Sequence, residues 1–295
     1  MRVTPSLSGF HLTRSVAAVA GFSLTIGMAV TAQEQDMFSA GEAYERFMGR
    51  WSRLLAPALV RFAQVEDGAR VLDVGSGTGS LAASVAAAAP TSQITGIDPA
   101  ESYVRFANTR HGSERTRFEV GDAQQLGFEE HSFDVVLSML VLNFIPDRKK
   151  AIDEMIRVTR PGGVVAAAVW DYGAGMEMLR VFWDEAVALR PEDAARDERH
   201  MPLCREGELA AFWRGHGLRD VSEQGLEVPT RFASFDDYWD PFLEKQGPAG
   251  AYVSQLTEPA REALRLRLRR RLLGDGPDRA FTLTARAWAV RGIVQ

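Results

Sequence analysis

The chain has 295 residues, of which 46% are hydrophobic and 25% are charged, and its formal net charge is −5. This length allows one large domain, or one domain with an appendage, and the acidic balance argues against a nucleic-acid-binding surface spread over the whole fold. The single cysteine, Cys204, excludes an intrachain disulfide, and the five histidines show no paired metal-ligand spacing. We therefore expect no metal site.

The first 36 residues differ in composition from the rest of the chain. A basic start precedes an uncharged stretch, 15–32, which ends in the small-residue tripeptide VTA, similar to a signal-peptidase site. The stretch is too rich in Ala, Gly, Ser and Thr to predict a membrane span. Two interpretations remain open, an export signal or an extension upstream of a start at Met37. We expect residues 1–36 to be a leader or a disordered extension, and 37–295 to form a single domain.

Beyond the first 36 residues, the hydrophobic pattern predicts an α/β fold. Amphipathic spacing indicates one or two helices over Gly41–Phe62, and short apolar runs then alternate with helical patterns. Such alternation is typical of a parallel sheet covered on both faces. The expected strands are Arg70–Val74, Gln93–Asp98, Arg117–Gly121, Phe133–Val141, Val164–Trp170, Asp220–Val228 and Phe281–Val290. The expected helices are Leu81–Ala89, Ala100–Thr109, Asp147–Thr159, Glu206–Trp213, Phe235–Leu243 and Pro259–Leu273.

A glycine-rich segment, VLDVGSGTGS at 71–80, lies between the first strand and the helix after it. Gly75, Gly77 and Gly79 occupy alternate positions there, and glycine lets the backbone turn sharply and approach a ligand closely. No Gly-Lys-Ser/Thr follows, which excludes a Walker phosphate loop. The third glycine also comes one residue early for the dinucleotide fingerprint, so the glycines alone do not identify the ligand.

Three acidic residues narrow the choice of ligand. Asp73, Asp98 and Asp122 stand at or just after the ends of the first three strands. Ligands of open α/β sheets bind beyond the carboxyl ends of the strands, so these carboxylates are expected to line one edge of one crevice. A pyrophosphate would be repelled there. A ligand with an ammonium group, a ribose diol and an adenine amine would find an acceptor for each.

Four segments between residues 41 and 170 carry a family resemblance. VLDVGSGTG, ITGIDPA, VGDAQQLGFEEHSFDVVLS and RVTRPGGVV resemble, in order and near spacing, the motifs of class I S-adenosylmethionine-dependent methyltransferases, in particular the small-molecule group called type 11. The resemblance implies a doubly wound, mostly parallel seven-stranded sheet of the Rossmann-like methyltransferase type, with an N-terminal helical cap. It also implies a cofactor-binding half, 41–170, and an acceptor-side half, 171–295.

The resemblance implies S-adenosyl-L-methionine as cofactor and assigns roles to individual residues. The glycines would shape the floor under the methionine part, and Asp73 would steer its ammonium group. Asp98 would accept both ribose hydroxyls, and Asp122 with the Ala123 amide would read the adenine edge. The full set of expected cofactor-binding residues is Tyr44, Arg50, Asp73, Gly75, Ser76, Gly77, Gly79, Asp98, Pro99, Asp122, Ala123 and Asn143.

Three of these residues have alternative interpretations. Asn143, at the end of the fourth strand, either lies near the sulfonium or caps the turn before Pro146. Tyr44 and Arg50 either fold over the cofactor, with Arg50 pairing its carboxylate, or belong to a packed helix face with Arg50 solvated.

The catalytic residues are not assigned by the sequence. Asp171 and Tyr172, after the fifth strand, are weak candidates for a general base, and the alternative is an ordinary polar turn. The aromatic segment 231–242 is either a wall of the acceptor pocket or a helix that seals the sheet edge. The arginine-rich run 264–274 favours a solvated helix face over an anionic partner.

The expected function is methyl transfer to a small-molecule acceptor by direct in-line displacement. Two other classes stay open, an NAD-dependent oxidoreductase that uses the same crevice and a catalytically silent S-adenosylmethionine-binding protein. No Asn/Asp-Pro-Pro-Tyr segment of the DNA-methylating kind follows the fourth strand, so no nucleic-acid partner is expected. Since the cofactor is made and held inside cells, we expect a cytoplasmic enzyme, with export as the alternative that the leader suggests.

Overall fold

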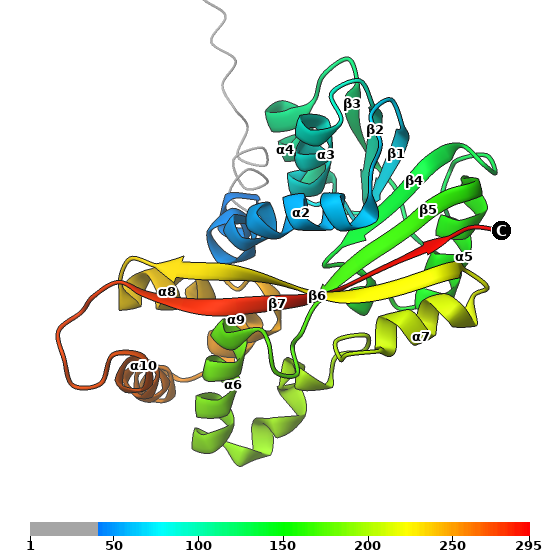
Figure 1. Ribbon diagram of the computed structural model, residues 1–295. Helices are drawn as coiled ribbons and strands as arrows, with labels where there is room; N and C mark the ends of the chain where they lie inside the picture. Colours follow the sequence, from blue (N-terminus) through cyan, green and yellow to red (C-terminus); the bar gives the residue numbers. More distant parts are fainter. Residues whose placement is uncertain (1–40) are drawn as a thin grey trace, which may run out of the picture.

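The computed structural model describes residues 41–295, which fold around one seven-stranded sheet (Figure 1). The strands lie in the order β3-β2-β1-β4-β5-β7-β6. Their bounds are Arg70–Val74 for β1, Gln93–Asp98 for β2, Thr116–Val120 for β3, Phe133–Met139 for β4, Thr159–Trp170 for β5, Arg219–Phe232 for β6 and Phe281–Ile293 for β7. Strand β7 is antiparallel to β5 and β6, and the other neighbours are parallel. The predicted fold class is confirmed, whereas the predictions for 1–36 lie outside the described residues.

Helices lie on both faces of this sheet, as the alternating pattern predicts (Figure 1). A π-helical turn, η1 (Glu45–Gly49), leads into α2, which buries Trp51, Leu55 and Leu59 and forms the N-terminal cap. The α-helices are α2 (Arg50–Ala63), α3 (Ser80–Ala88), α4 (Glu101–His111), α5 (Arg148–Val158), α6 (Glu177–Leu189), α7 (Glu208–Gly215), α8 (Phe235–Leu243), α9 (Gly247–Gln255) and α10 (Glu258–Leu273). Short 3-10 helices are η2 (Leu142–Phe144), η3 (Pro191–Arg196) and η4 (Glu198–His200).

The strand order reverses at β1, and this reversal positions the site. Strand β1 pairs with β2 on one side and with β4 on the other, so that Asp73 is aligned with both Gly96 and Leu137. Loops that leave neighbouring strands in opposite directions open a crevice at the carboxyl ends of the strands. The glycine turn follows β1 at this point.

The second half of the chain contains elements that the sequence pattern does not predict. Strands β6 and β7 are longer than expected and extend as a pair beyond the ends of the other five strands. Helices α6, α8, α9 and α10 lie around this extension (Figure 1). Helices α6 and α9 were not predicted. In α9, GPAGAYVSQ, one proline and two glycines lower the intrinsic helix propensity. Tertiary packing overrides it, because Ala249, Tyr252 and Val253 are buried.

The aromatic segment 231–242 packs into this extension. The Tyr238 hydroxyl donates a hydrogen bond to the Met178 carbonyl at 2.9 Å, and the Phe242 ring stacks on Phe182 with centroids 4.6 Å apart. None of its residues lines either of the two cavities described below. The segment therefore packs against α6 and forms no wall of these two cavities, whereas Asp236, Asp237, Asp240 and Pro241 line a separate pocket with charged walls.

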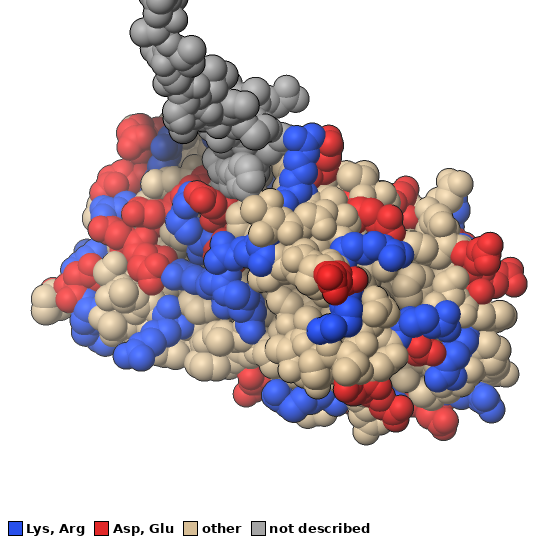
Figure 2. Space-filling model, turned by 90° about the horizontal axis from the view of Figure 1, so that it is seen from above, with Lys and Arg blue, Asp and Glu red and all other residues tan. Residues whose placement is uncertain are grey.

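The arginine-rich run forms the exposed side of α10 and is paired internally. Leu264 and Leu268 are buried, and Arg267 and Arg271 form ion pairs with Glu185 at 2.7 and 3.1 Å. Acidic and basic side chains are mixed over the face seen in Figure 2.

None of the helices described between residues 41 and 295 is long and apolar enough to cross a membrane.

Candidate functional site

The three glycines of the turn after β1 share a backbone conformation but differ in what surrounds them. Gly75, Gly77 and Gly79 have φ values of 75°, 51° and 90°, in the left-handed region that favours glycine. A Cβ at Gly75 would lie 2.5 Å from Val141, and one at Gly79 would lie 2.9 Å from His111. A Cβ at Gly77 would meet nothing within 4 Å. Packing therefore requires the outer two glycines, whereas the middle one leaves open space.

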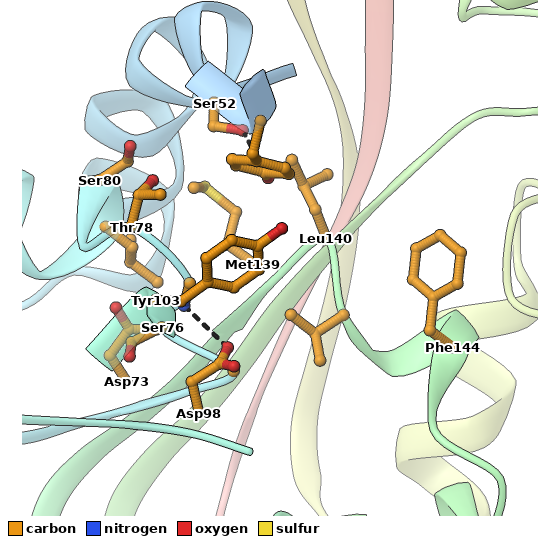
Figure 3. A pocket seen from close by; sticks show the side chains of 15 residues that line it. Ser52, Asp73, Ser76, Thr78, Ser80, Asp98, Tyr103, Met139, Leu140 and Phe144 are labelled. Atoms are coloured by element: carbon orange, nitrogen blue, oxygen red, sulfur yellow. Dashed lines mark hydrogen bonds between the residues drawn. The ribbon is translucent and has the colours of Figure 1, made fainter. Parts of the chain in front are cut away.

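That open space belongs to a cavity at the carboxyl ends of β1, β2 and β4 (Figure 3). Its empty volume is about 640 Å³, including the open mouth. The glycine turn and the ends of β1 and β2 contribute one wall, and Tyr103 of α4 reaches across it. Leu140 and Phe144, beyond the end of β4, close the side away from Asp73. The predicted crevice is thus present where the motifs meet.

Asp73 brings an unsatisfied carboxylate to this cavity. Its side chain is 1% exposed, and Oδ2 accepts a hydrogen bond from the Ala82 amide at 3.1 Å. Oδ1 is buried and has no hydrogen-bond partner among residues 41–295. Burial raises the pKa of this carboxyl to about 7, despite the Ala82 hydrogen bond. A buried carboxylate with a free oxygen favours a cationic or hydrogen-bond-donating ligand.

Asp98 holds the glycine turn from the neighbouring strand. Its Oδ2 accepts the Gly77 amide at 2.9 Å, drawn as a dashed line in Figure 3, and Oδ1 accepts the Ala100 amide at 2.9 Å. Burial raises the pKa of this carboxyl too. Each carboxylate oxygen has a second lone pair, so both can still accept a hydrogen bond from a ligand.

The raised pKa of Asp73 predicts that ligand affinity depends on pH. Only the carboxylate attracts a cation, so affinity for S-adenosylhomocysteine, which retains the ammonium group, should fall about tenfold between about pH 8 and about pH 6. The free energy of unfolding of the ligand-free protein should change in the opposite direction. A raised folded-state pKa stabilises the fold at low pH, and this contribution is lost as pH rises from about 4 to about 7.

Calorimetric titrations at about pH 6 and about pH 8 would test the expected change in affinity. Urea unfolding between about pH 4 and about pH 7 would test the expected change in stability. Asp73→Asn is the control, and it should bind weakly with little pH dependence. Equal affinity of the parent protein at both pH values would contradict the assignment of Asp73.

The two N-terminal candidates have different surroundings. Tyr44 lines the cavity, with its ring 5.7 Å from that of Tyr103. Arg50 does not line it, because its Nη1 forms an ion pair with Asp237 Oδ1 at 2.7 Å and its guanidinium lies over the Trp51 ring at 4.2 Å. In this structure the Arg50 side chain is therefore paired with Asp237 and lies outside the cavity that Asp73 lines.

Residues beyond the ends of β2 and β3 flank the crevice without lining the cavity. Pro99 follows Asp98 directly and is exposed. Asp122 is also exposed and accepts the Gln124 amide at 2.8 Å, a hydrogen bond that lowers its pKa, and Ala123 is buried. A ligand would contact these residues only by extending along the sheet edge.

The polar residues after β4 and β5 differ in whether their side chains form hydrogen bonds or ion pairs within the protein. Asn143 is 4% exposed, and its carboxamide makes no hydrogen bond to the turn before Pro146; it lies near the Tyr172 hydroxyl, whose pKa it lowers against the larger effect of burial. Asp171 is committed to structure, because Oδ2 pairs with Arg286 Nη2 at 2.6 Å and Oδ1 accepts the Ala174 amide at 2.9 Å. Of the two base candidates, Tyr172 lines the second of the two cavities described here, and Asp171 lines neither.

That cavity adjoins the first and has an empty volume of about 430 Å³, including its mouth. The two cavities share Tyr44, Leu140 and Phe144 in their walls. Leu140 has a φ of 67°, a strained value for a leucine, and its amide donates to the Ala168 carbonyl at 2.7 Å. The second cavity is also lined by Phe47, Met48, Trp170, Tyr172, Leu179, Glu198, Gly247 and Pro248.

Sequence reasoning missed Glu198. It is the one charged side chain among the residues that line the second cavity, and it is 4% exposed. Burial raises its pKa to about 7. The surrounding letters, RDERH, are typical of an exposed loop and contain no motif that indicates a buried glutamate.

Comparisons with known proteins agree with this geometry. A family model described as a methyltransferase domain matches residues 72–167. An uncharacterized protein of Mycobacterium tuberculosis is 34% identical over 200 residues, which cover 66% of this chain and 70% of that protein. A malonyl-[acyl-carrier protein] O-methyltransferase of Methylococcus capsulatus is 35% identical over 116 residues, covering 39% of this chain and 42% of that protein.

A solved structure shows the same fold. The phosphoethanolamine N-methyltransferase 2 of Haemonchus contortus matches with a TM-score of 0.54 at 21% identity, over 88% of this chain and 58% of that chain. Fold and motifs together define a class I methyltransferase architecture. The chain belongs to the class I S-adenosylmethionine-dependent methyltransferase family, in its type 11 domain group.

Proposed function

We propose that the protein is an enzyme that transfers a methyl group from S-adenosyl-L-methionine to a small-molecule acceptor. The observation that carries the proposal is the unpartnered Oδ1 of Asp73, which is buried at the cavity beside the open face of Gly77. An acidic site of this kind disfavours a pyrophosphate and suits the ammonium group of the cofactor.

The residues present fit the cofactor along its length. Asp73 would hold the ammonium group, Asp98 the ribose diol, and Asp122 with the Ala123 amide the adenine edge, while Tyr44 would cover the bound molecule. Gly75, Ser76, Gly77, Gly79, Pro99 and Asn143 complete the proposed contacts. The bound cofactor supplies a methyl group activated by its sulfonium.

The protein itself must hold the acceptor in line with the methyl group and exclude water from both. Tyr44, Leu140 and Phe144 stand between the two cavities, where an acceptor would face the activated methyl group. Such alignment can contribute about 7–11 kcal/mol to lowering the barrier. The cofactor-binding half, 41–170, and the acceptor-side half, 171–295, would work as one domain, because both contribute to the second cavity. The supply of cofactor inside cells favours a cytoplasmic location.

Calorimetry followed by a transfer assay tests this function. S-adenosylmethionine and S-adenosylhomocysteine are expected to bind, whereas NAD is not. A screen of small acceptors with a labelled methyl donor should then give a labelled product. Binding of NAD in place of the other two would indicate an oxidoreductase, and cofactor binding without transfer to any acceptor would indicate a silent binding protein.

A further inference from the structure

The second cavity has an apolar lining with one carboxyl group. Its walls are aromatic and aliphatic side chains together with the hydroxyl-bearing rings of Tyr44 and Tyr172, and no Lys, Arg or His of the described chain lines it. Tyr172 is almost fully buried, and burial raises the pKa of its phenol well above the usual value. The phenol is therefore neutral, and Glu198 is the only group in this cavity that can carry a negative charge near neutral pH.

The surrounding structure holds Glu198 in place. The Trp183 indole N–H donates to Glu198 Oε2 at 2.7 Å, and Oε1 receives no hydrogen bond within residues 41–295. The preceding residue, Asp197, anchors the segment, because its carboxylate pairs with Arg180 and with Arg199, each at 2.6 Å. Arg199 is engaged by Asp197, whereas Arg180 keeps Nε and Nη1 buried without partners among the described residues, and its charge lowers the pKa of Glu198 against the larger effect of burial. No ion pair joins Arg180 to Glu198 within residues 41–295, and Arg180 does not line the cavity.

This arrangement selects among acceptor classes. An anionic acceptor would meet a carboxylate and no cation, which is unfavourable in a buried site. A cationic acceptor would leave its other hydrogen-bond donors unpaired, because this cavity, unlike the one at Asp73, has no Ser or Thr and no second carboxylate among the described residues that line it, so that desolvation offsets much of the attraction to Glu198. A neutral apolar molecule with a hydroxyl group fills the cavity and donates a hydrogen bond to the free oxygen.

We propose that the second cavity is the acceptor site, that it takes a neutral, apolar ring compound bearing a phenolic or enolic hydroxyl, and that Glu198 is the general base. The proposal rests on the proposed methyl transfer. The Glu198 carboxylate takes the hydroxyl proton as the acceptor oxygen forms a bond to the methyl carbon. The carbon–sulfur bond breaks with its electron pair staying on sulfur, which gives a methyl ether, S-adenosylhomocysteine and a protonated Glu198. A carboxyl with a pKa near 7 suits this proton transfer at neutral pH.

Binding of simple probes tests the site without requiring turnover. In the presence of S-adenosylhomocysteine, the parent protein should bind 2-naphthol about tenfold more tightly than naphthalene. The reason is that the naphthol hydroxyl can donate a hydrogen bond to the charged Glu198 carboxylate, whereas naphthalene has no donor. It should also bind 2-naphthol more tightly than 2-naphthoate or the cationic 2-naphthylmethylammonium. Glu198→Gln keeps the shape and an acceptor for the Trp183 N–H, and it should lose most of the preference for naphthol. Glu192→Gln, at an exposed position on η3, is the matched control and should keep it.

Turnover provides the second readout. With an acceptor found by the labelled-methyl screen, kcat of the parent should rise with pH up to about 7, and Glu198→Gln should lower kcat about 10²–10⁴-fold and abolish that rise. Its affinity for S-adenosylhomocysteine should stay at the parent value. Naphthol preference retained in Glu198→Gln, tighter binding of the naphthoate or the ammonium probe, or an unchanged pH profile would each overturn the proposal. Failure of S-adenosylhomocysteine to bind the parent protein would instead refute the proposed function.

Discussion

Replacing Gly77 with valine is expected to abolish binding of S-adenosylhomocysteine while the protein stays folded. A Cβ at this position meets no protein atom within 4 Å, so a branched side chain would occupy cavity space that the ligand needs. The φ of 51° is strained for a valine and costs about 1–3 kcal/mol, which a domain of this size tolerates. Circular dichroism and a binding titration on the same preparation measure both effects.

The matched control for strain is Gly207→Val. Gly207 also has a positive φ, 84°, with nothing within 4 Å of its added Cβ, but it lies at the start of α7 and lines neither cavity. This variant should lose a similar amount of stability and keep the parent's affinity. A folded Gly77→Val protein with full affinity would refute the assignment of the glycine turn to the cofactor.

Replacing Asp98 with alanine is expected to weaken S-adenosylhomocysteine binding by about 10²–10⁴-fold. Two hydrogen bonds from the ribose diol to a carboxylate are lost, each worth about 1.5–3 kcal/mol. The structure adds a second cause, because Asp98 Oδ2 also holds the Gly77 amide and the turn loses this tether. Asp98→Asn keeps the shape with one acceptor oxygen, and we expect an intermediate loss.

An analogue of S-adenosylhomocysteine without the two ribose hydroxyls separates these causes. Its affinity should fall much less on Asp98→Ala than that of the complete molecule, because only the loss of the tether then contributes. If both ligands lose affinity equally, Asp98 acts on the turn alone and the ribose lies elsewhere.

The order of elements over 41–170 could be read from the sequence, with errors of one or two residues at most ends and of five at the start of β5, which begins at Thr159 and not at Val164. Continuous apolar runs such as VLDV form buried parallel strands, and the Asp147 side chain begins α5 by accepting the Lys150 amide at 3.0 Å. These are local patterns, in which a few neighbouring residues determine the backbone conformation. The segment from 171 to 255 was less predictable because its helices depend on long-range packing, as α9 shows.

The sequence by itself determined that Asp73 and Asp98 end neighbouring strands beside a glycine turn. The parallel order of strands then places them at one sheet edge, because each motif sits at a fixed point of a strand–turn–helix unit. Only the tertiary structure decided which polar groups have partners. Asp171 and Arg50 looked available but are bound to Arg286 and Asp237, at sequence separations of 115 and 187 residues.

Glu198 is the opposite case, a residue that looks solvated in the sequence but is buried in the structure. Nothing in RDERH distinguishes it from a solvated glutamate, because the cavity that buries it is built from residues of the N-terminal cap, the loop after β4, η2, β5, α6 and α9. Burial, a free oxygen and a pKa near 7 are properties of that assembled environment. Motifs therefore located the glycine turn and the two buried carboxylates of the first cavity, because these follow from local strand–turn–helix patterns, whereas the packing of distant side chains decided which groups line the second cavity.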